Sequence, residues 1–125
     1  MKRLLVCLLL VGVVGCGKSD ADKARTELNK GVGLFDLKDW ATAIACCNEA
    51  IRIKPDEAYA SYGRGVAYRK KGQYDKAIAD FTAAIRIDPD DAEAYINRGV
   101  AHRKLGLDVK ADADFAKAKE LGLAP

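Results

Sequence analysis

The sequence predicts an all-α protein made of three helix-turn-helix units behind a short N-terminal targeting segment. Three observations predict this fold. From Ala24 to Pro125 the chain repeats every 34 residues without insertion or deletion, in copies 24–57, 58–91 and 92–125. Small and bulky residues recur at fixed places in each copy. The composition, 50% hydrophobic and 31% charged, is typical of a folded, helix-prone domain.

The N-terminal segment, MKRLLVCLLLVGVVGCGKS, has the pattern of an export signal. Basic Lys2 and Arg3 precede an apolar run, 4–14, which is too short to span a bilayer comfortably as a helix. The run ends in Val13-Val14-Gly15-Cys16, which resembles the lipobox of bacterial lipoproteins.

This resemblance implies a signal peptide over 1–15 that is cleaved and a lipidated cysteine with a polar tether over 16–23. In lipoproteins the thiol, here that of Cys16, receives a diacylglyceryl group, and the new amine is often acylated too, for example with palmitate. Two or more acyl chains give stable anchoring, since each buried methylene contributes about 0.8 kcal/mol. Gly17, in place of aspartate, implies the periplasmic side of the outer membrane rather than the inner membrane.

Two alternatives stay open for this segment. One is an ordinary secretory signal in which Cys16 is incidental. The other is a nucleotide-binding protein, because 12–19 matches the GxxxxGK[ST] pattern of a phosphate-binding loop. That loop needs a parallel sheet, whereas everything after residue 24 is helical repeat, and cleavage before Cys16 would divide it. We therefore expect no cofactor and no enzymatic activity.

Within each copy, glycine occupies position 8, alanine occupies positions 20 and 27, and larger residues occupy positions 11 and 24. These residues are Gly31, Gly65, Gly99, Ala43, Ala77, Ala111, Ala50, Ala84, Ala118, Leu34, Tyr68, His102, Cys47, Phe81 and Phe115. The pattern resembles the tetratricopeptide-repeat (TPR) family over 24–125, most clearly in AYASYGRGVAYRKKGQYDKAIADFTAAIRIDP. This resemblance implies a right-handed α-solenoid of three units in which each helix pair packs closely.

The ends of the helices follow from glycine and proline. Gly72 and Gly106 stand where the first helices of the second and third copies should end in a left-handed residue. Pro55 and Pro89 should stop the second helices of the first two copies.

Position 7 is basic in every copy and needs a partner where it is partly buried. Position 23 supplies aspartate in the second and third copies but Cys46 in the first. We therefore predict the ion pairs Arg64–Asp80 and Arg98–Asp114, and no such pair for Lys30.

The third unit should cap the stack by itself. Positions 17, 21 and 28 are apolar or aromatic in the first two copies and charged in the third. A terminal repeat must become polar where a further repeat would pack. The residues are Trp40, Ile44, Ile51, Tyr74, Ile78 and Ile85, and then Asp108, Asp112 and Lys119.

By family analogy the first helices line a concave groove through positions 2, 5, 9, 12 and 13. Its middle is apolar and aromatic and its edge is basic, a combination that suits a peptide with an apolar core and an acidic flank. The expected contact residues are Tyr59, Tyr62, Val66, Arg69, Ile96, Val100 and Arg103, with Arg25, Leu28, Val32 and Phe35 in the first copy.

Some TPR domains hold a chaperone's C-terminal carboxylate with a clamp of basic and asparagine side chains. The corresponding places here are Leu28, Val32, Gly63, Glu93 and Asn97, so none of the three basic places is filled. We do not expect capture of that kind.

Other partners and activities are not indicated. Without Lys2 and Arg3, 19 basic residues face 18 acidic ones, so the charge gives no reason to expect nucleic acid. No CxxC pair accompanies the single histidine, so no metal is expected. His102 should be a core or half-buried residue rather than a catalytic base. Cys47 should be a core residue and Cys46 a partly exposed one, without a disulfide between them.

We thus expect a lipid-anchored scaffold of the bacterial cell envelope that binds a protein or peptide, as an adaptor in envelope assembly or secretion, and takes no small-molecule substrate. A self-associating structural repeat protein is a further alternative, against which the charged last helix argues.

Overall fold

The computed structural model describes residues 23, 25–27, 29–30 and 39–123. The predicted signal peptide, the lipidated cysteine and the phosphate-loop match lie outside these residues. So do most of the groove positions of the first copy, among them Leu28, Val32 and Phe35. Those expectations therefore stay predictions.

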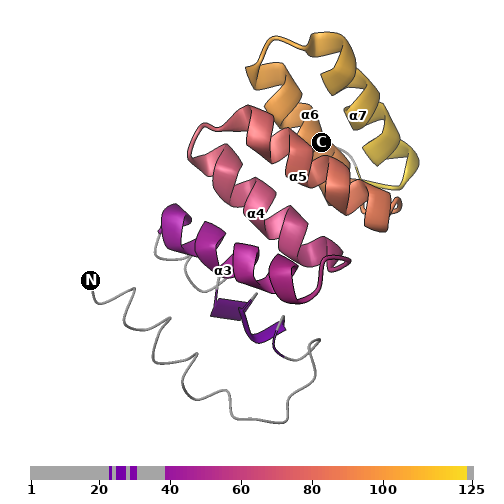
Figure 1. Cartoon of the computed structure of the whole chain (residues 1–125). Coiled ribbons are helices and arrows are strands. Elements are labelled where there is room, and N and C mark those ends of the chain that lie inside the picture. The colour runs from indigo at the N-terminus through magenta and orange to yellow at the C-terminus, as the bar shows by residue number, and fades with distance from the viewer. Residues whose placement is uncertain (1–22, 24, 28, 31–38, 124–125) are drawn as a thin grey trace.

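The described part of the chain is helical, with turns and no strand. After short helical stretches between residues 23 and 30 come five helices, which Figure 1 labels in chain order. They are α3 (Trp40–Ile53), α4 (Ala58–Lys70), α5 (Tyr74–Ile87), α6 (Ala92–Lys104) and α7 (Asp108–Glu120). This architecture confirms the all-α prediction.

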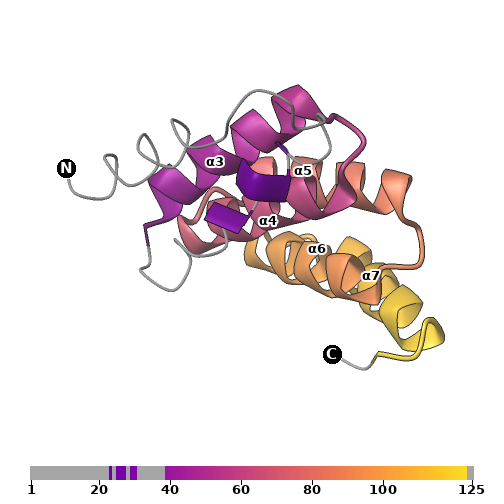
Figure 2. The same cartoon turned by 90° about the horizontal axis from the view of Figure 1, so that it is seen from below.

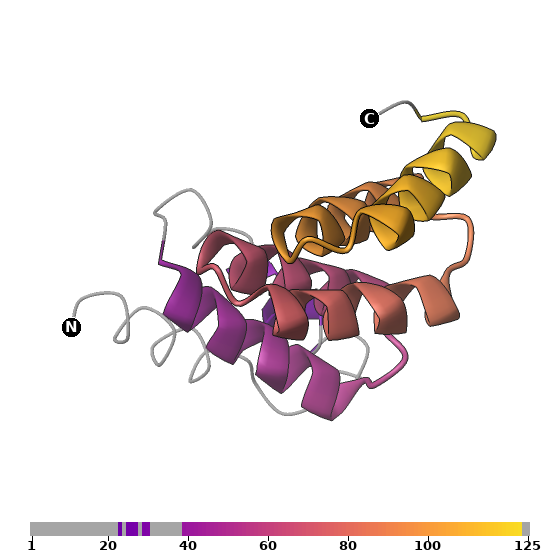
Figure 3. The same ribbon diagram turned by 90° about the horizontal axis from the view of Figure 1, so that it is seen from above.

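The helices stack in sequence order. Each of the helices α3 to α6 packs against the next one, and α4 also contacts α6, the corresponding helix of the following unit. Figures 2 and 3 show the same succession from below and from above, with α6 and α7 at the C-terminal end. No helix within the described residues is both long enough and apolar enough to cross a membrane.

The helix ends lie where glycine and proline predicted them. Gly72 and Gly106 have φ values of 80° and 77°, in the left-handed region that favours glycine. Both turns are closed in the same way: the amide of Gln73 donates to the carbonyl of Tyr68 at 2.9 Å, as Leu107 does to His102. The helices α3 and α5 end two residues before Pro55 and Pro89. Gly122, with a φ of 98°, follows α7 in the same conformation, which the sequence analysis did not foresee.

The close packing of each helix pair depends on the glycine at position 8. A Cβ atom on Gly65 would lie 2.8 Å from Cε1 of Phe81, which is fully buried. A Cβ on Gly99 would lie 2.7 Å from the same atom of Phe115. The alanines at positions 20 and 27 of all three copies are buried as well. The predicted reason for these small residues is therefore confirmed.

Both predicted ion pairs are present and bidentate. Arg64 donates to the two carboxylate oxygens of Asp80 at 2.8 and 2.6 Å, and Arg98 donates to those of Asp114 at 3.0 and 2.6 Å. Lys30 instead pairs within its own helix with Glu27, at 2.5 Å.

Each arginine also reaches back to the preceding unit, which sequence analysis missed. Nη1 of Arg64 donates to Oδ1 of Asn48 on α3 at 2.8 Å, and Nη1 of Arg98 donates to Oγ1 of Thr82 on α5 at 3.3 Å. Each guanidinium thus joins three helices of two adjacent units.

The last helix is polar where a further unit would pack. Asp108, Asp112 and Lys119 are exposed on α7, whereas Ile44 is buried and Ile78 is half-buried at the corresponding places. The positions that were predicted to change from apolar to charged in the third unit are therefore exposed on its last helix.

One expectation about the cysteines was wrong. Cys47 is fully buried, as predicted, but Cys46 is buried too, at 4% exposure. Cys46 packs in a cluster with Ala43, Ile44 and Ala67, the last of which lies on the first helix of the next unit. Neither cysteine forms a disulfide, and burial raises the pKa of Cys47 to about 11.

Candidate functional site: the inner face of the first helices

The helices α4 and α6 turn equivalent side chains toward one face. Residues at helical spacings of three and four lie on the same side of a helix, and α4 contacts α6 directly. We call this surface the inner face. It carries Tyr59, Tyr62, Val66, Glu93, Ile96, Asn97 and Val100. Of the predicted contact residues, Tyr62, Val66, Ile96 and Val100 are half-buried there.

Two tyrosines form the aromatic part of the inner face. The rings of Tyr59 and Tyr62 stack with centroids 6.1 Å apart and an interplanar angle of 24°. Tyr62 also packs against the buried Phe81, at 5.9 Å and 58°. Tyr59 is 55% exposed, although it is a large aromatic residue. The pair therefore has one ring supported by the core and one ring open to a ligand.

A polar bridge holds Tyr62 between the two units. Its hydroxyl donates to Oε2 of Glu93 at 3.4 Å and accepts from Nδ2 of Asn97 at 3.1 Å. The same Nδ2 donates to the backbone carbonyl of Glu93 at 2.9 Å. Burial and the neighbouring carboxylates raise the pKa of Tyr62 to about 12, so the phenol stays neutral and keeps its proton for Glu93.

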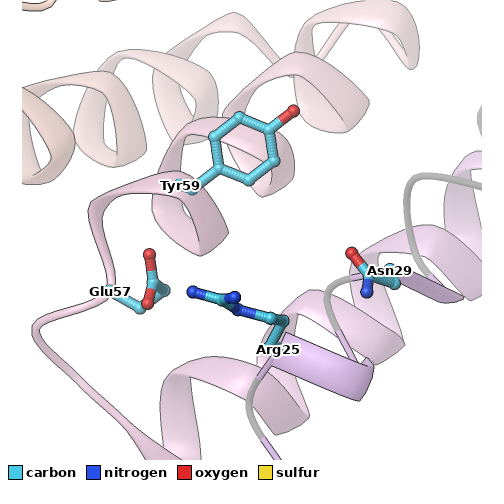
Figure 4. A pocket seen from close by; sticks show the side chains of 4 residues that line it. All are labelled: Arg25, Asn29, Glu57 and Tyr59. Atoms are coloured by element: carbon cyan, nitrogen blue, oxygen red, sulfur yellow. The ribbon is translucent and has the colours of Figure 1, made fainter. Parts of the chain in front are cut away.

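A pocket of about 440 Å³ opens beside Tyr59. It is lined by Arg25, Asn29, Glu57 and Tyr59, and Figure 4 shows the side chains of Arg25 and Asn29 on the first helical stretch opposite α4. Arg25 and Tyr59 were predicted groove residues, and the structure brings them together.

Asn29 and Glu57 were missed as lining residues. Asn29 occupies position 6, the same position as Asn97 in the third copy, so the repeat register could have indicated it. Glu57 belongs to the turn between units, at the last position of its copy. Helical spacing alone does not show which way the side chain of a turn residue points.

The structure places the two predicted arginines differently. Arg69 is half-buried, and its Nε is a buried donor with no hydrogen-bond partner among the described residues. Arg103 lies with its guanidinium 5.0 Å from the ring centroid of Phe115 and bonds to Asp112 on α7. Its Nε also lies 3.9 Å from the carboxylate of Asp108. Arg103 is therefore engaged by the charged surface of the last helix.

His102 lies in the core, as predicted. It is 8% exposed, and its Nε2 lies 3.6 Å from Oδ2 of Asp114. Burial lowers its pKa below the ordinary value, more than the carboxylate of Asp114 raises it. In the part of the chain that the structure describes, no group of three or more His, Cys, Asp or Glu residues is placed to hold a metal ion.

Comparisons with known proteins agree with this geometry. A family model described as TPR repeat matches residues 33–72 and 67–106. No curated protein matches the chain in sequence.

Solved structures resemble it over most of its length. The second TPR of Spaghetti (RPAP3), bound to the HSP90 peptide SRMEEVD, is 30% identical with a TM-score of 0.80, over 82% of this chain and 94% of that one. The Arabidopsis OM64 TPR domain is 28% identical with a TM-score of 0.81, over 82% and 85%. MamA is 31% identical with a TM-score of 0.77, over 79% and 58%.

Proposed function

The chain belongs to the tetratricopeptide-repeat family, and we infer that it holds a segment of a partner protein against its inner face, as a membrane-anchored adaptor. It is a protein-interaction module, as TPR domains are. The finer proposal concerns where the partner binds and where the protein resides.

The observation that carries the binding proposal is the exposure of Tyr59. A tyrosine that is 55% exposed, stacked on a second tyrosine with core support, is a rigid aromatic surface that loses little side-chain entropy when covered. Half-buried Val66, Ile96 and Val100 extend the surface with apolar area. A solved relative, the second TPR of RPAP3, is bound to the HSP90 peptide SRMEEVD, which supports peptide binding as the mode of action here.

The membrane proposal rests on the N-terminal sequence. The apolar run that ends at Cys16, followed by a polar tether, supports lipidation there and attachment to the bacterial envelope, on the periplasmic side of the outer membrane. In that setting the repeat domain would hold its partner near the membrane surface during envelope assembly or secretion.

Crosslinking in membranes tests the binding proposal. Tyr59→Ala removes the exposed ring without opening the core, and Lys119→Glu changes an exposed residue on α7, away from the inner face. We expect a discrete crosslinked partner, identified by mass spectrometry, with the wild type and with Lys119→Glu, and a several-fold loss with Tyr59→Ala. Equal capture by all three proteins would refute the assignment.

Mass spectrometry of the mature N-terminus tests the anchor. An acylated Cys16 as the first residue is expected, and Cys16→Ser should leave the protein unprocessed and without the acyl mass. An uncut, unmodified Met1 would contradict the proposal and restore the phosphate-loop alternative.

A further inference from the structure

Cations of this chain cover several of its own aromatic rings. Nζ of Lys76 lies 5.5 Å from the ring centroid of Tyr68. The guanidinium of Arg98 lies 5.6 Å from the ring of Tyr95, and that of Arg103 lies 5.0 Å from the ring of Phe115. Such contacts are attractive because the face of an aromatic ring carries negative charge.

The two tyrosines of the inner face differ from these rings. Among the described residues no cation lies over Tyr59 or Tyr62, whose ring partners are each other and Phe81. Their pair is therefore an aromatic surface without a cation of the kind that lies over Tyr68, Tyr95 and Phe115.

Carboxylates stand on two sides of this pair. Glu57 lines the pocket beside Tyr59 (Figure 4), and Glu93 accepts the hydrogen bond of Tyr62. Glu93 is exposed and makes no ion pair within the described part of the chain. Glu57 has only a 3.7 Å contact with Lys54, at 30% side-chain exposure. Burial raises the pKa of Tyr62, and the carboxylates of Glu93 and Asp91 raise it further.

The pocket beside Tyr59 also has a cation in its lining, Arg25. Arg25 projects from the first helical stretch toward Glu57 (Figure 4), without an ion pair to it among the contacts of the described residues. The side of the tyrosines that faces α6 has Glu93 and Asn97 as its polar neighbours. Glu93 is thus the charged group that contacts Tyr62 from α6.

We propose that the partner segment supplies a lysine or arginine side chain that lies over the Tyr59–Tyr62 pair with its charge beside Glu93. The proposal rests on the inferred peptide binding and specifies the chemistry of the partner: a basic segment, rather than an acidic tail. Arginine should bind better than lysine, because its planar guanidinium stacks on a ring and donates to a carboxylate at once.

Peptide arrays test this with the mature, detergent-solubilised full-length protein. The probes are heptapeptides of matched composition whose central residue is Arg, Lys, Gln or Glu. We expect binding to fall in that order. The dissociation constants of the best Arg peptides are then compared for the wild type, Glu93→Gln, Tyr59→Leu and the control Glu120→Gln, which removes an exposed carboxylate on α7.

Glu93→Gln should weaken the Arg peptides about tenfold and the Gln peptides little, as the loss of a charge-assisted contact does. Tyr59→Leu should weaken them about 3- to 30-fold, the range of a cation–π contact. Glu120→Gln should change nothing, and Glu93→Lys should reverse the preference toward Glu peptides. Because Glu93 and Tyr59 are exposed, unchanged thermal unfolding will verify that the variants are folded.

The outcomes separate the two proposals. Binding that depends on Tyr59 but favours Gln or Glu peptides, or a loss with Glu93→Gln no larger than with Glu120→Gln, would overturn the basic-segment proposal alone. An array with no binding at any central residue, together with crosslinking indifferent to Tyr59, would overturn peptide binding itself and this inference with it.

Discussion

The ion pair between Arg64 and Asp80 should be among the more important polar interactions for the stability of the stack. Its aspartate side chain is 7% exposed and its arginine side chain 26%, so the carboxylate is the more buried partner. Two charge-assisted hydrogen bonds join them, and a third links Arg64 to Asn48 of the preceding unit. The hydrogen bond to Asp80 raises the pKa of Arg64 further, so the guanidinium stays protonated at neutral pH.

Removing Arg64 should lower the free energy of unfolding more than removing Asp80. Asp80→Ala leaves a guanidinium that water can partly reach and that still bonds to Asn48, so we expect a loss of about 2–3 kcal/mol. Arg64→Met leaves a nearly buried carboxylate unpaired, and we expect about 3–5 kcal/mol. The double variant should lose less than the sum of the two, by about 2 kcal/mol, because neither charge is then left alone.

Urea unfolding followed by circular dichroism measures these changes. With a slope of about 1.5 kcal/mol per molar urea, Asp80→Ala should lower the midpoint by about 1.3–2 M. The surface pair Glu49–Arg52 gives a matched control, because it has the same two-fold hydrogen bonding but an exposed position. Glu49→Gln should leave the midpoint unchanged. Additive losses in the double variant, or an equal effect of Glu49→Gln, would refute the reasoning.

Three further predictions concern the core. Gly65→Ala should destabilise by about 1–3 kcal/mol, although alanine is the better helix former, because the new Cβ would lie 2.8 Å from the immobile ring of Phe81; a raised melting temperature would contradict this. Burial lowers the pKa of His102 below 6.5, so the folded state binds fewer protons than the unfolded state. The stability from the neutral imidazole should therefore be complete above pH 6.5 and decline as the pH falls toward the folded pKa, and His102→Tyr should remove this decline in urea midpoints measured from pH 7.5 to 5. Cys46 and Cys47 should resist iodoacetamide at pH 7.5 until urea unfolds the domain, since both are buried and the pKa of Cys47 is raised to about 11; rapid labelling of their tryptic peptide in the native protein would count against the packing described.

Much of the candidate site could be predicted because the repeat specifies the helix face on which each side chain lies. A helix puts residues three and four apart on one face, so the positions of Tyr59, Tyr62 and Val66 follow from the register of the unit. The register could not predict which residues of the next unit each side chain contacts. Tyr62 bonds to Glu93 and Asn97 of the next unit, and those distances depend on how two units stack.

The two basic residues predicted at the edge of the groove, Arg69 and Arg103, also show what the register predicts and what it leaves open. Arg69 and Arg103 occupy equivalent positions, so the sequence assigned both to one edge of the groove. In the structure, Arg103 donates a hydrogen bond to Asp112 of α7, because only the last unit has a charged residue at position 21. The second unit has Ile78 there, which offers no acceptor, and the half-buried Arg69 has no hydrogen-bond partner for its Nε among the described residues.

By itself the sequence determined the period, the helix ends, the close approach of each helix pair and the pairing of position 7 with position 23. These depend on contacts inside one 34-residue unit, whose geometry the spacing of small and bulky residues already restricts. Only the tertiary structure decided the burial of Cys46, the bonds from Arg64 and Arg98 back to the preceding unit, and the open aromatic surface beside Glu93. Those features form between units, where a long side chain can reach several partners and the distance between helices selects one of them.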